Sequence, residues 1–323
     1  MKRVFFAVTA SLIALMLASP AVVAQNYPAK TVRVIIPWPP GGSNDISGRI
    51  VFQKVTANTG QQFVIDNRGG AGGTIGADVV AKSPPDGYTI MVHSAAHITN
   101  AHLYKKLPYD TLNDFIGVTP LATQVGMLVV HPSLPAKNVK QLIAIAKARP
   151  DQITYGSSGN GSFVHLSMAL FDSMTNTKMI HVPYKGGGPA VVALISGEIQ
   201  AMIATVGSVL PYVKTNRVRA LGVTSAHRSK ALPDMPTIAE SGVPGYEFTA
   251  WIAVFVPAKT PRPIVDRLSA EIKKALDDPE IEKSLSAQTL DPLYMTPEQF
   301  ATRLKADYET NAKLVKLTGL KID

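Results

Sequence analysis

Three glycine-rich segments of the chain combine small hydroxyl side chains with backbone N–H groups. They lie at 39–45, 69–74 and 156–162, and each follows an apolar run and precedes a helical pattern. A helix start offers unpaired N–H groups and a positive dipole end, which favour a bound anion, although glycines also serve tight turns. The pattern predicts a cleft for a small oxygen-rich anion with a hydroxyl lining: Ser43, Thr74, Ser94, Ser157, Ser158, Ser162 and Thr205.

Two aromatic residues and a histidine stand beside these segments. Trp38 lies between Pro37 and Pro39, just before the first segment, a place that favours contact with a ligand over burial in a core. Tyr184 precedes a further run of glycines. Both side chains offer an apolar wall or a stacking surface. His165 follows the third segment, where it either reaches the ligand or packs as a hydrogen-bonded residue.

Motifs for nucleotide binding and for common hydrolytic mechanisms are missing from the sequence. Neither G-x-x-x-x-G-K-[ST] nor G-x-G-x-x-G occurs, which argues against a P-loop and against a nicotinamide or flavin enzyme. The segment 156–160 carries asparagine where a nucleophile elbow requires its last glycine. We therefore expect a non-enzymatic protein without a cofactor. The alternative is a hydrolase that uses Ser157 or Ser158 with His165.

The overall composition is that of a globular protein. The 323 residues are 46% hydrophobic and 17% charged, with a mean hydropathy of +0.12. At roughly 150 residues per domain, this length favours two domains. The absence of cysteine excludes disulfides, cysteine nucleophiles and thiolate-bound metals. His93 and His97 have the i, i+4 spacing of a metal pair, but we expect no metal site.

Basic residues are spread along the chain. The net charge is +9 at pH 7, yet the cations occur only in small groups such as Lys105–Lys106 and Lys273–Lys274. No basic run alternates with aromatic residues, as a single-stranded nucleic-acid surface would require. We therefore expect no nucleic-acid partner, and a solvated basic surface that steers anions toward the protein.

The N-terminus has the layout of a secretory signal peptide. Lys2 and Arg3 precede the apolar stretch 4–17, and small residues allow cleavage after Ala24. The apolar stretch is short for a membrane anchor, although an uncleaved tether is the alternative. We therefore expect residues 1–24 to be removed and the mature protein to be soluble, unlipidated and periplasmic.

The pattern of apolar runs and loops predicts an α/β fold. Short β-branched or apolar runs predict strands at 31–36, 63–66, 88–92, 126–130, 153–155, 180–182, 201–204, 219–224 and 248–256. Helical patterns occur at 74–82, 138–148, 163–174, 189–196, 261–276 and 297–317, with another helix from about residue 45 and a short one near 279. Alternating strands and helices predict a parallel or mixed sheet covered on both faces.

Several motifs of the chain together resemble one family of receptors. They read IPWPPGGSND at 36–45, DNRGGAGGTIG at 66–76, PDGYT at 85–89, LPYD at 107–110, YGSSGNGS at 155–162 and HVPYKG at 181–186. In this order and spacing they resemble the Bug family, the periplasmic receptors related to the substrate-binding component of tripartite tricarboxylate transporters. The resemblance covers residues 27–323.

The resemblance implies a two-lobed periplasmic binding protein of type II-like, Venus flytrap architecture. Each lobe is expected to be a mixed sheet flanked by helices. Lobe 1 would comprise 26–125 with 246–323, and lobe 2 would comprise 126–245. We expect the lobes to close around the ligand by a hinge at the two crossovers, near residues 125 and 245.

The resemblance also implies a small mono-, di- or aromatic carboxylate as the ligand, held through backbone amides and ordered water. Residue types and resemblance together give the candidate ligand-binding residues as Trp38, Pro39, Gly41, Gly42, Ser43, Asn44, Asp45, Gly72, Gly73, Thr74, Ser94, Ser157, Ser158, Gly159, Ser162, Tyr184 and Thr205. The expected protein is a monomer that delivers its ligand to membrane transporter subunits. A sensor domain is the alternative partner, because a sensing receptor would share every one of these features.

One stretch departs from the pattern of the family. Family members often carry acidic residues and an aromatic residue where this chain has Gln200, Ala204 and Thr205. If the second acidic position faces the cleft, Thr205 removes a partner for an ammonium group. This predicts that amino acids are disfavoured as ligands.

Overall fold

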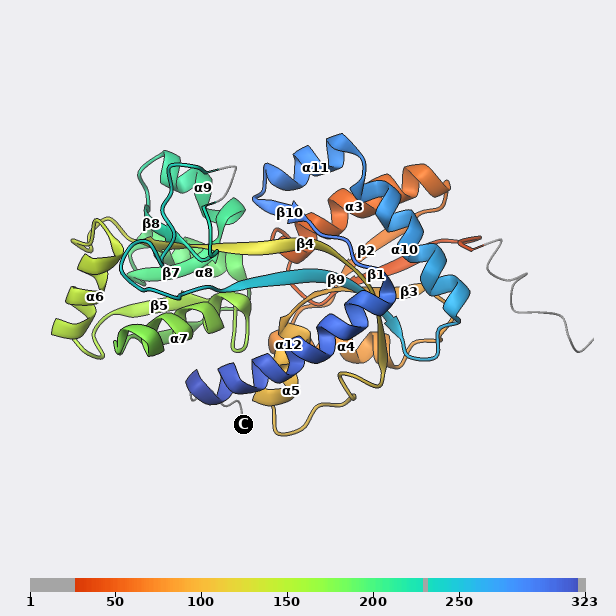
Figure 1. Cartoon of the computed structure of the whole chain (residues 1–323), viewed down its shortest axis with the longest axis horizontal. Helices are drawn as coiled ribbons and strands as arrows, with labels where there is room; N and C mark the ends of the chain where they lie inside the picture. Colours follow the sequence, from red (N-terminus) through yellow and green to blue (C-terminus); the bar gives the residue numbers. More distant parts are fainter. Residues whose placement is uncertain (1–26, 229–231, 319–323) are drawn as a thin grey trace, which may run out of the picture.

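A computed structural model of the chain describes residues 27–228 and 232–318 (Figure 1). The predicted signal peptide, 1–24, lies outside the described residues. Within the described ranges, none of the helices is both long enough and apolar enough to cross a membrane.

The secondary structure alternates between strands and helices over most of the chain. The strands are β1 (Val32–Ile36), β2 (Phe63–Asn67), β3 (Thr89–Ser94), β4 (Phe115–Val130), β5 (Thr154–Ser157), β6 (Ile180–Pro183), β7 (Ala201–Thr205), β8 (Arg219–Val223), β9 (Thr249–Pro257) and β10 (Leu290–Pro292). The helices are α3 (Ser43–Thr59), the 3-10 turn η1 (Ala71–Gly73), α4 (Thr74–Ala81), α5 (Ala96–Leu103), α6 (Val139–Ala148), α7 (Phe163–Thr175), α8 (Gly187–Ser196), α9 (Val206–Lys214), α10 (Arg262–Leu276), α11 (Pro279–Ser286) and α12 (Pro297–Thr318).

The strands form a mixed sheet in the order β2-β1-β3-β9-β4-β7-β5-β6, with β8 and β10 also pairing with β4. Pairs at the two ends of this order are parallel, as in β1 with β2 and β5 with β6. The central strands β9, β4 and β7 pair antiparallel. The predicted mixed sheet with flanking helices is therefore confirmed.

The long strand β4 belongs to both halves of the molecule. Its first part, up to Val125, pairs with β9, and from Gly126 onward it pairs with β7. In Figure 1, β4 and β9 run side by side from one half of the molecule into the other. The sequence predicted only 126–130 as strand, because Pro120 and two register shifts interrupt the alternating pattern earlier in β4.

The buried apolar residues separate into groups that follow the two halves. One cluster draws its buried members from 125–246. Two others draw theirs from 27–122 and 251–304. In this second half of the molecule, α3, α10 and α11 cover one face of the sheet, and α4, α5 and α12 cover the other (Figure 1). The lobe limits at 125 and 245 stay a prediction.

Two helices of the structure were not predicted from the sequence. Helix α5 has no side-chain cap at its start, and a polar contact from Thr99 Oγ1 to Asn311 Oδ1 (2.7 Å) ties it to α12. Helix α9 contains Pro211, which normally interrupts a helical pattern. In both cases packing against distant elements outweighs weak local helix signals.

Candidate ligand-binding site

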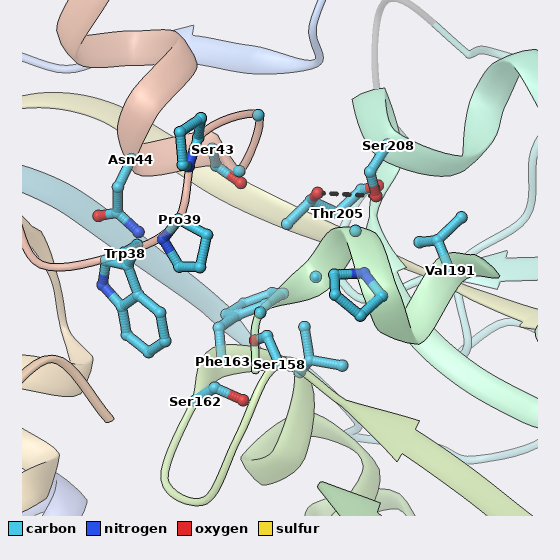
Figure 2. A pocket seen from close by; sticks show the side chains of 18 of the residues that line it. Trp38, Pro39, Ser43, Asn44, Ser158, Ser162, Phe163, Val191, Thr205 and Ser208 are labelled. Carbon is cyan, nitrogen blue, oxygen red and sulfur yellow. Dashed lines mark hydrogen bonds between the residues drawn. The ribbon is translucent and has the colours of Figure 1, made fainter. Parts of the chain in front are cut away.

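A cavity of about 350 Å³ lies between the two halves of the molecule. Figure 2 shows Trp38, Pro39 and Ser43 on one side of it, with Val191, Thr205 and Ser208 on the other. Ten of the predicted ligand-binding residues line this cavity: Trp38, Pro39, Gly41, Gly42, Ser43, Asn44, Ser94, Ser158, Ser162 and Thr205. Their role in binding a ligand stays a prediction.

Four helices begin at the cavity. They are α3 from one half and α7, α8 and α9 from the other, and residues at each of these starts line the cavity. Only α7 has a side-chain cap among them, where Ser162 Oγ accepts from the His165 N–H. The first N–H groups of a helix have no partner within it, and the helix dipole adds partial positive charge. These four helix starts therefore favour a negatively charged group in the cavity.

Charged side chains do not take part in this lining. Among the described residues that line the cavity, none carries a carboxylate, ammonium, guanidinium or imidazole group. An anion bound here would therefore be held by backbone N–H groups and hydroxyls. Such a site favours a negatively charged ligand and offers an ammonium group no counter-charge.

Three buried polar atoms on the lining have no hydrogen-bond partner. They are Ser43 Oγ, Asn44 Oδ1 and Gln124 Oε1, in residues that are 7%, 8% and 4% exposed. A buried polar atom without a partner is costly, so these atoms favour a polar ligand or ordered water in the cavity. Gln124 was not predicted as a site residue, because it lies in the part of β4 that the sequence pattern does not reveal.

The opposite wall of the cavity is largely apolar. Phe163, Val191 and Met202 are buried, and each lines the cavity. The remaining lining residues that sequence reasoning missed are Pro40, Val164, Gly186, Gly187, Gly188, Pro189, Val192, Ser208 and Tyr212. The signal for Gly186–Gly188 is present in the sequence, as a fourth glycine-rich junction between a strand and a helix.

The second glycine-rich segment does not reach the cavity. Gly72, Gly73 and Thr74 are not among the residues that line it. Asn100 Nδ2 donates to Gly72 O (2.9 Å), and a Cβ at Gly73 would lie 2.6 Å from His93 Nε2. A Cβ at Gly72 would also lie 3.2 Å from the backbone oxygen of Asn160, so the segment packs closely against both halves of the molecule.

Four further predicted residues also lie off the lining. The Asp45 carboxylate accepts a hydrogen bond from the Gly41 N–H. Ser157 is fully buried, and Gly159 N–H donates to its hydroxyl (3.1 Å). The Tyr184 hydroxyl donates to Glu198 Oε1 (2.7 Å).

The histidine pair considered for a metal supports Trp38 instead. Trp38 Nε1 donates to His93 Nδ1 (3.3 Å), and the His93 and His97 rings lie 5.5 Å apart between centroids. Burial lowers the pKa of His93 well below its ordinary value and that of His97 to about 3. Residues 27–228 and 232–318 contain no group of three or more His, Cys, Asp or Glu side chains that could hold a metal.

One of the two serines of the hydrolase alternative, Ser157, pairs with a histidine other than His165. Ser157 Oγ lies 2.6 Å from Nε2 of His181, whereas His165 Nδ1 accepts from the Gly161 N–H (3.1 Å). The His165 and His181 rings stack with centroids 3.7 Å apart. Since Ser157 is fully buried and does not line the cavity, it is not placed to attack a ligand there.

The stacked histidines predict that the protein loses stability in mild acid. Burial lowers the pKa of His165 to about 3 and that of His181 to about 4, from 6.5. Below about pH 6.5 the unfolded chain therefore binds more protons than the folded protein, so the free energy of unfolding falls as the pH drops. We expect His165 alone to cost about 2 kcal/mol on going from pH 7 to pH 5, measured by urea denaturation.

Two variants make this prediction specific. His165→Gln removes one titrating group and should flatten the dependence of unfolding free energy on pH. Met174→Gln, at an exposed residue of the same helix α7 that does not titrate, should leave it unchanged. Equal pH dependence in wild type and H165Q would contradict the prediction.

Most of the chain matches the model of one protein family. Residues 48–320 match the model of the tripartite tricarboxylate transporter family receptor. The chain belongs to this family. The expected resemblance to Bug receptors is confirmed by BugT of Bordetella pertussis, which is 35% identical to this receptor over 301 residues, 93% of this chain and 92% of BugT. The UPF0065 protein in the tcbD–tcbE intergenic region of Pseudomonas sp. strain P51 is 39% identical over 290 residues, 90% of this chain and 86% of that protein.

Solved structures of similar sequence share the fold of this receptor. Rpa4515 of R. palustris with adipate has a TM-score of 0.88 and 35% identity, covering 91% of this chain and 99% of that one. MatC of Rhodopseudomonas palustris with bound malate has a TM-score of 0.83 and 29% identity, covering 90% and 100%. The periplasmic binding protein BugD has a TM-score of 0.86 and 29% identity, covering 91% and 99%. The predicted periplasmic binding protein fold is confirmed.

Proposed function

We propose that this receptor binds a small carboxylate in the cavity between its two halves and delivers it to the membrane subunits of a tripartite tricarboxylate-type transporter. The observation that carries this proposal is the convergence of four helix starts on a cavity lined by unpartnered polar atoms and no charged side chain. Two structural neighbours of this receptor are described with adipate and with malate, both carboxylates.

The lining further supports a ligand without an ammonium group. The Thr205 hydroxyl, which stands where relatives often have an acidic residue, donates to Ser208 Oγ (3.0 Å). Gln200 Oε1 accepts from the Thr154 N–H and hydroxyl at 2.8 Å. Neither residue offers a negative charge to the cavity. We therefore propose that acidic amino acids bind more weakly than plain or aromatic carboxylates.

Closure of the two halves is part of the proposal. The chain passes between them through β4 and β9, which supports the proposal of a hinge near residues 125 and 245. At the rim of the cavity the halves already meet, since a Cβ at Gly186 would lie 2.9 Å from Pro39 Cγ. The receptor would work in the periplasm as a monomer, after export directed by residues 1–24.

The test is a thermal-shift screen of the mature protein against adipate, malate, citrate, benzoate, aspartate and glutamate. A ligand present at about 100 times its Kd should stabilise the fold by about 2.7 kcal/mol, and so raise Tm by several degrees. We expect such shifts with plain or aromatic carboxylates and smaller ones with the two amino acids. Tight binding of aspartate or glutamate with no response to the other acids would overturn the proposed ligand class.

A further inference from the structure

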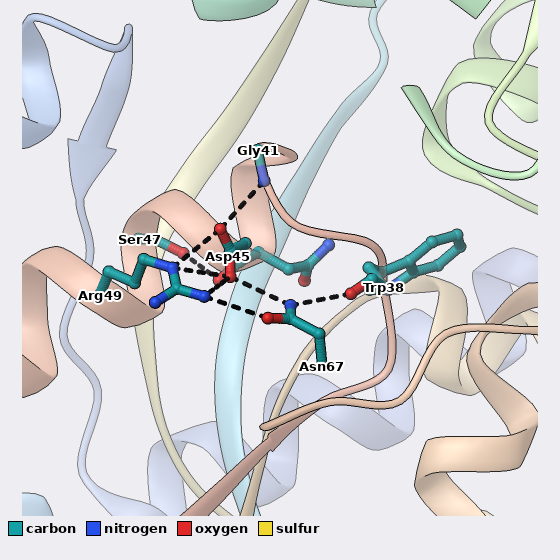
Figure 3. A network of polar contacts seen from close by, with 7 residues as sticks. Trp38, Gly41, Asp45, Ser47, Arg49 and Asn67 are labelled. Carbon is teal, nitrogen blue, oxygen red and sulfur yellow. Dashed lines mark hydrogen bonds and ion pairs between the residues drawn. The ribbon is translucent and has the colours of Figure 1, made fainter. Parts of the chain in front are cut away.

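The loop from Trp38 to Gly42, which lines the cavity and leads into α3, is held by a network of polar side chains that lie outside the lining. Figure 3 shows Asp45, Arg49 and Asn67 gathered under the segment from Trp38 to Gly41. None of these three side chains lines the cavity, whereas the loop above them does. The network therefore touches the loop without being placed to contact a ligand in the cavity.

Asp45 fixes one end of the loop. It lies in the first turn of α3, and its Oδ2 accepts a hydrogen bond from the Gly41 N–H (2.9 Å). Gly41 has a φ of +83°, a conformation that glycine adopts readily. The bond to Asp45 therefore holds the turn at the point where the chain enters α3.

Asn67 fixes the other end. This residue ends β2, and its Nδ2 donates both to the backbone oxygen of Trp38 (2.9 Å) and to Asp45 Oδ1 (3.0 Å). One side-chain amide thus joins the two ends of the loop. The Trp38 ring is fixed separately, because its Nε1 donates a hydrogen bond to His93 Nδ1.

Arg49 completes the network and balances its charge. Its Nε lies 3.0 Å from both carboxylate oxygens of Asp45, and one terminal nitrogen donates to Asn67 Oδ1 (3.0 Å). Burial alone would raise the pKa of Asp45, but the bonds from Arg49, Gly41 and Asn67 hold it below its ordinary value. Asp45 is thus a buried anion beside the start of α3, where an unneutralised negative charge would repel a bound carboxylate.

We propose that Asn67 and Arg49 are positioning residues for ligand binding. Arg49 acts through Asp45, and Asn67 acts through Asp45 and the Trp38 backbone oxygen; together they hold the backbone between Trp38 and Gly41 in the conformation that presents the start of α3 to the cavity. The expected effect of this network on ligand affinity rests on the proposed function. Its expected effect on the loop does not depend on any ligand. Asn67 provides a direct test, because it bonds to Trp38 and to Asp45 but not to Gly41, so any effect on the Gly41 amide must pass through these contacts.

The test compares Asn67→Ala with Gln62→Ala, a matched change at an exposed residue just before β2. Amide hydrogen exchange is measured by NMR on the full mature protein without ligand. We expect N67A to accelerate exchange at the Gly41 amide about tenfold, with no change at the core amide of Val34, while Q62A leaves both unchanged. Calorimetry with adipate and with malate should show binding to N67A weakened about tenfold.

Two outcomes would overturn the inference. One is equal Gly41 exchange in N67A and Q62A. The other is equal acceleration at Gly41 and Val34, which would mean a general loss of stability. If N67A does not fold, Arg49→Gln takes its place. The Arg49 side chain is 51% exposed, so its replacement should spare the fold. The expected result is the same. If the wild-type protein binds neither acid, the proposed function fails for these probes, and the exchange data still decide whether the network positions the loop.

Discussion

Replacing Ser43 with aspartate is expected to abolish carboxylate binding while leaving the fold intact. Ser43 is the first residue of α3, and its buried Oγ has no partner. A carboxylate here would occupy the start of the helix and repel a ligand carboxylate. Two like charges about 4 Å apart near a protein surface repel by about 4 kcal/mol, roughly a thousandfold in affinity. The loss should be measured by calorimetry with adipate and with malate.

The same substitution should change stability little. Aspartate in the first turn of a helix interacts favourably with its dipole, by about 0.3 to 1 kcal/mol. This gain offsets part of the cost of a second buried carboxylate close to Asp45, so S43D is expected to unfold in urea at or slightly below the wild-type concentration. The control is Ser43→Ala, which removes only the hydroxyl and should weaken binding about fivefold. Wild-type affinity in S43D would show that the start of α3 does not hold the ligand.

Replacing Gly76 with alanine is expected to destabilise the fold strongly. A Cβ at this position in α4 would lie 2.7 Å from Pro37 Cβ, 2.8 Å from the backbone oxygen of Arg68 and 2.9 Å from Pro37 Cα. Backbone atoms and a proline ring cannot move aside as a flexible side chain does. We expect G76A to lower the free energy of unfolding by about 3 kcal/mol in urea denaturation.

The matched control for this substitution is Gly188→Ala. Gly188 also lies early in a helix, α8, but nothing stands within 4 Å of its added Cβ. Alanine favours a helix over glycine by about 1 kcal/mol, so G188A should leave stability unchanged or raise it. Similar losses in the two variants would contradict the explanation by close packing.

The glycine-rich junctions could be predicted from the sequence because their chemistry is local. A β-branched run, a glycine-rich loop and a helical pattern already place unpaired N–H groups beside small hydroxyls. This holds for the loop at 39–45, which begins α3, and for the loop at 156–162, which begins α7. Both contribute residues to the cavity. The order and spacing of the motifs also identified the family and its fold.

Which loops meet in one cavity depended on contacts between distant parts of the chain. The junction at 69–74 has the same local signature, yet it packs on His93 and Asn100, away from the cavity. The junction at 186–188 lines the cavity instead, and Gln124 reaches it from the central strand β4.

By itself, therefore, the sequence determined the family, the mixed α/β fold and the backbone chemistry of the loops, since each of these depends on neighbouring residues or on motif order. Only the tertiary structure decided which loops form the cavity and which side chains support them. The physical reason is that the cavity arises where helices from two halves converge. Their convergence depends on how β4 pairs with β9 on one side and with β7 on the other.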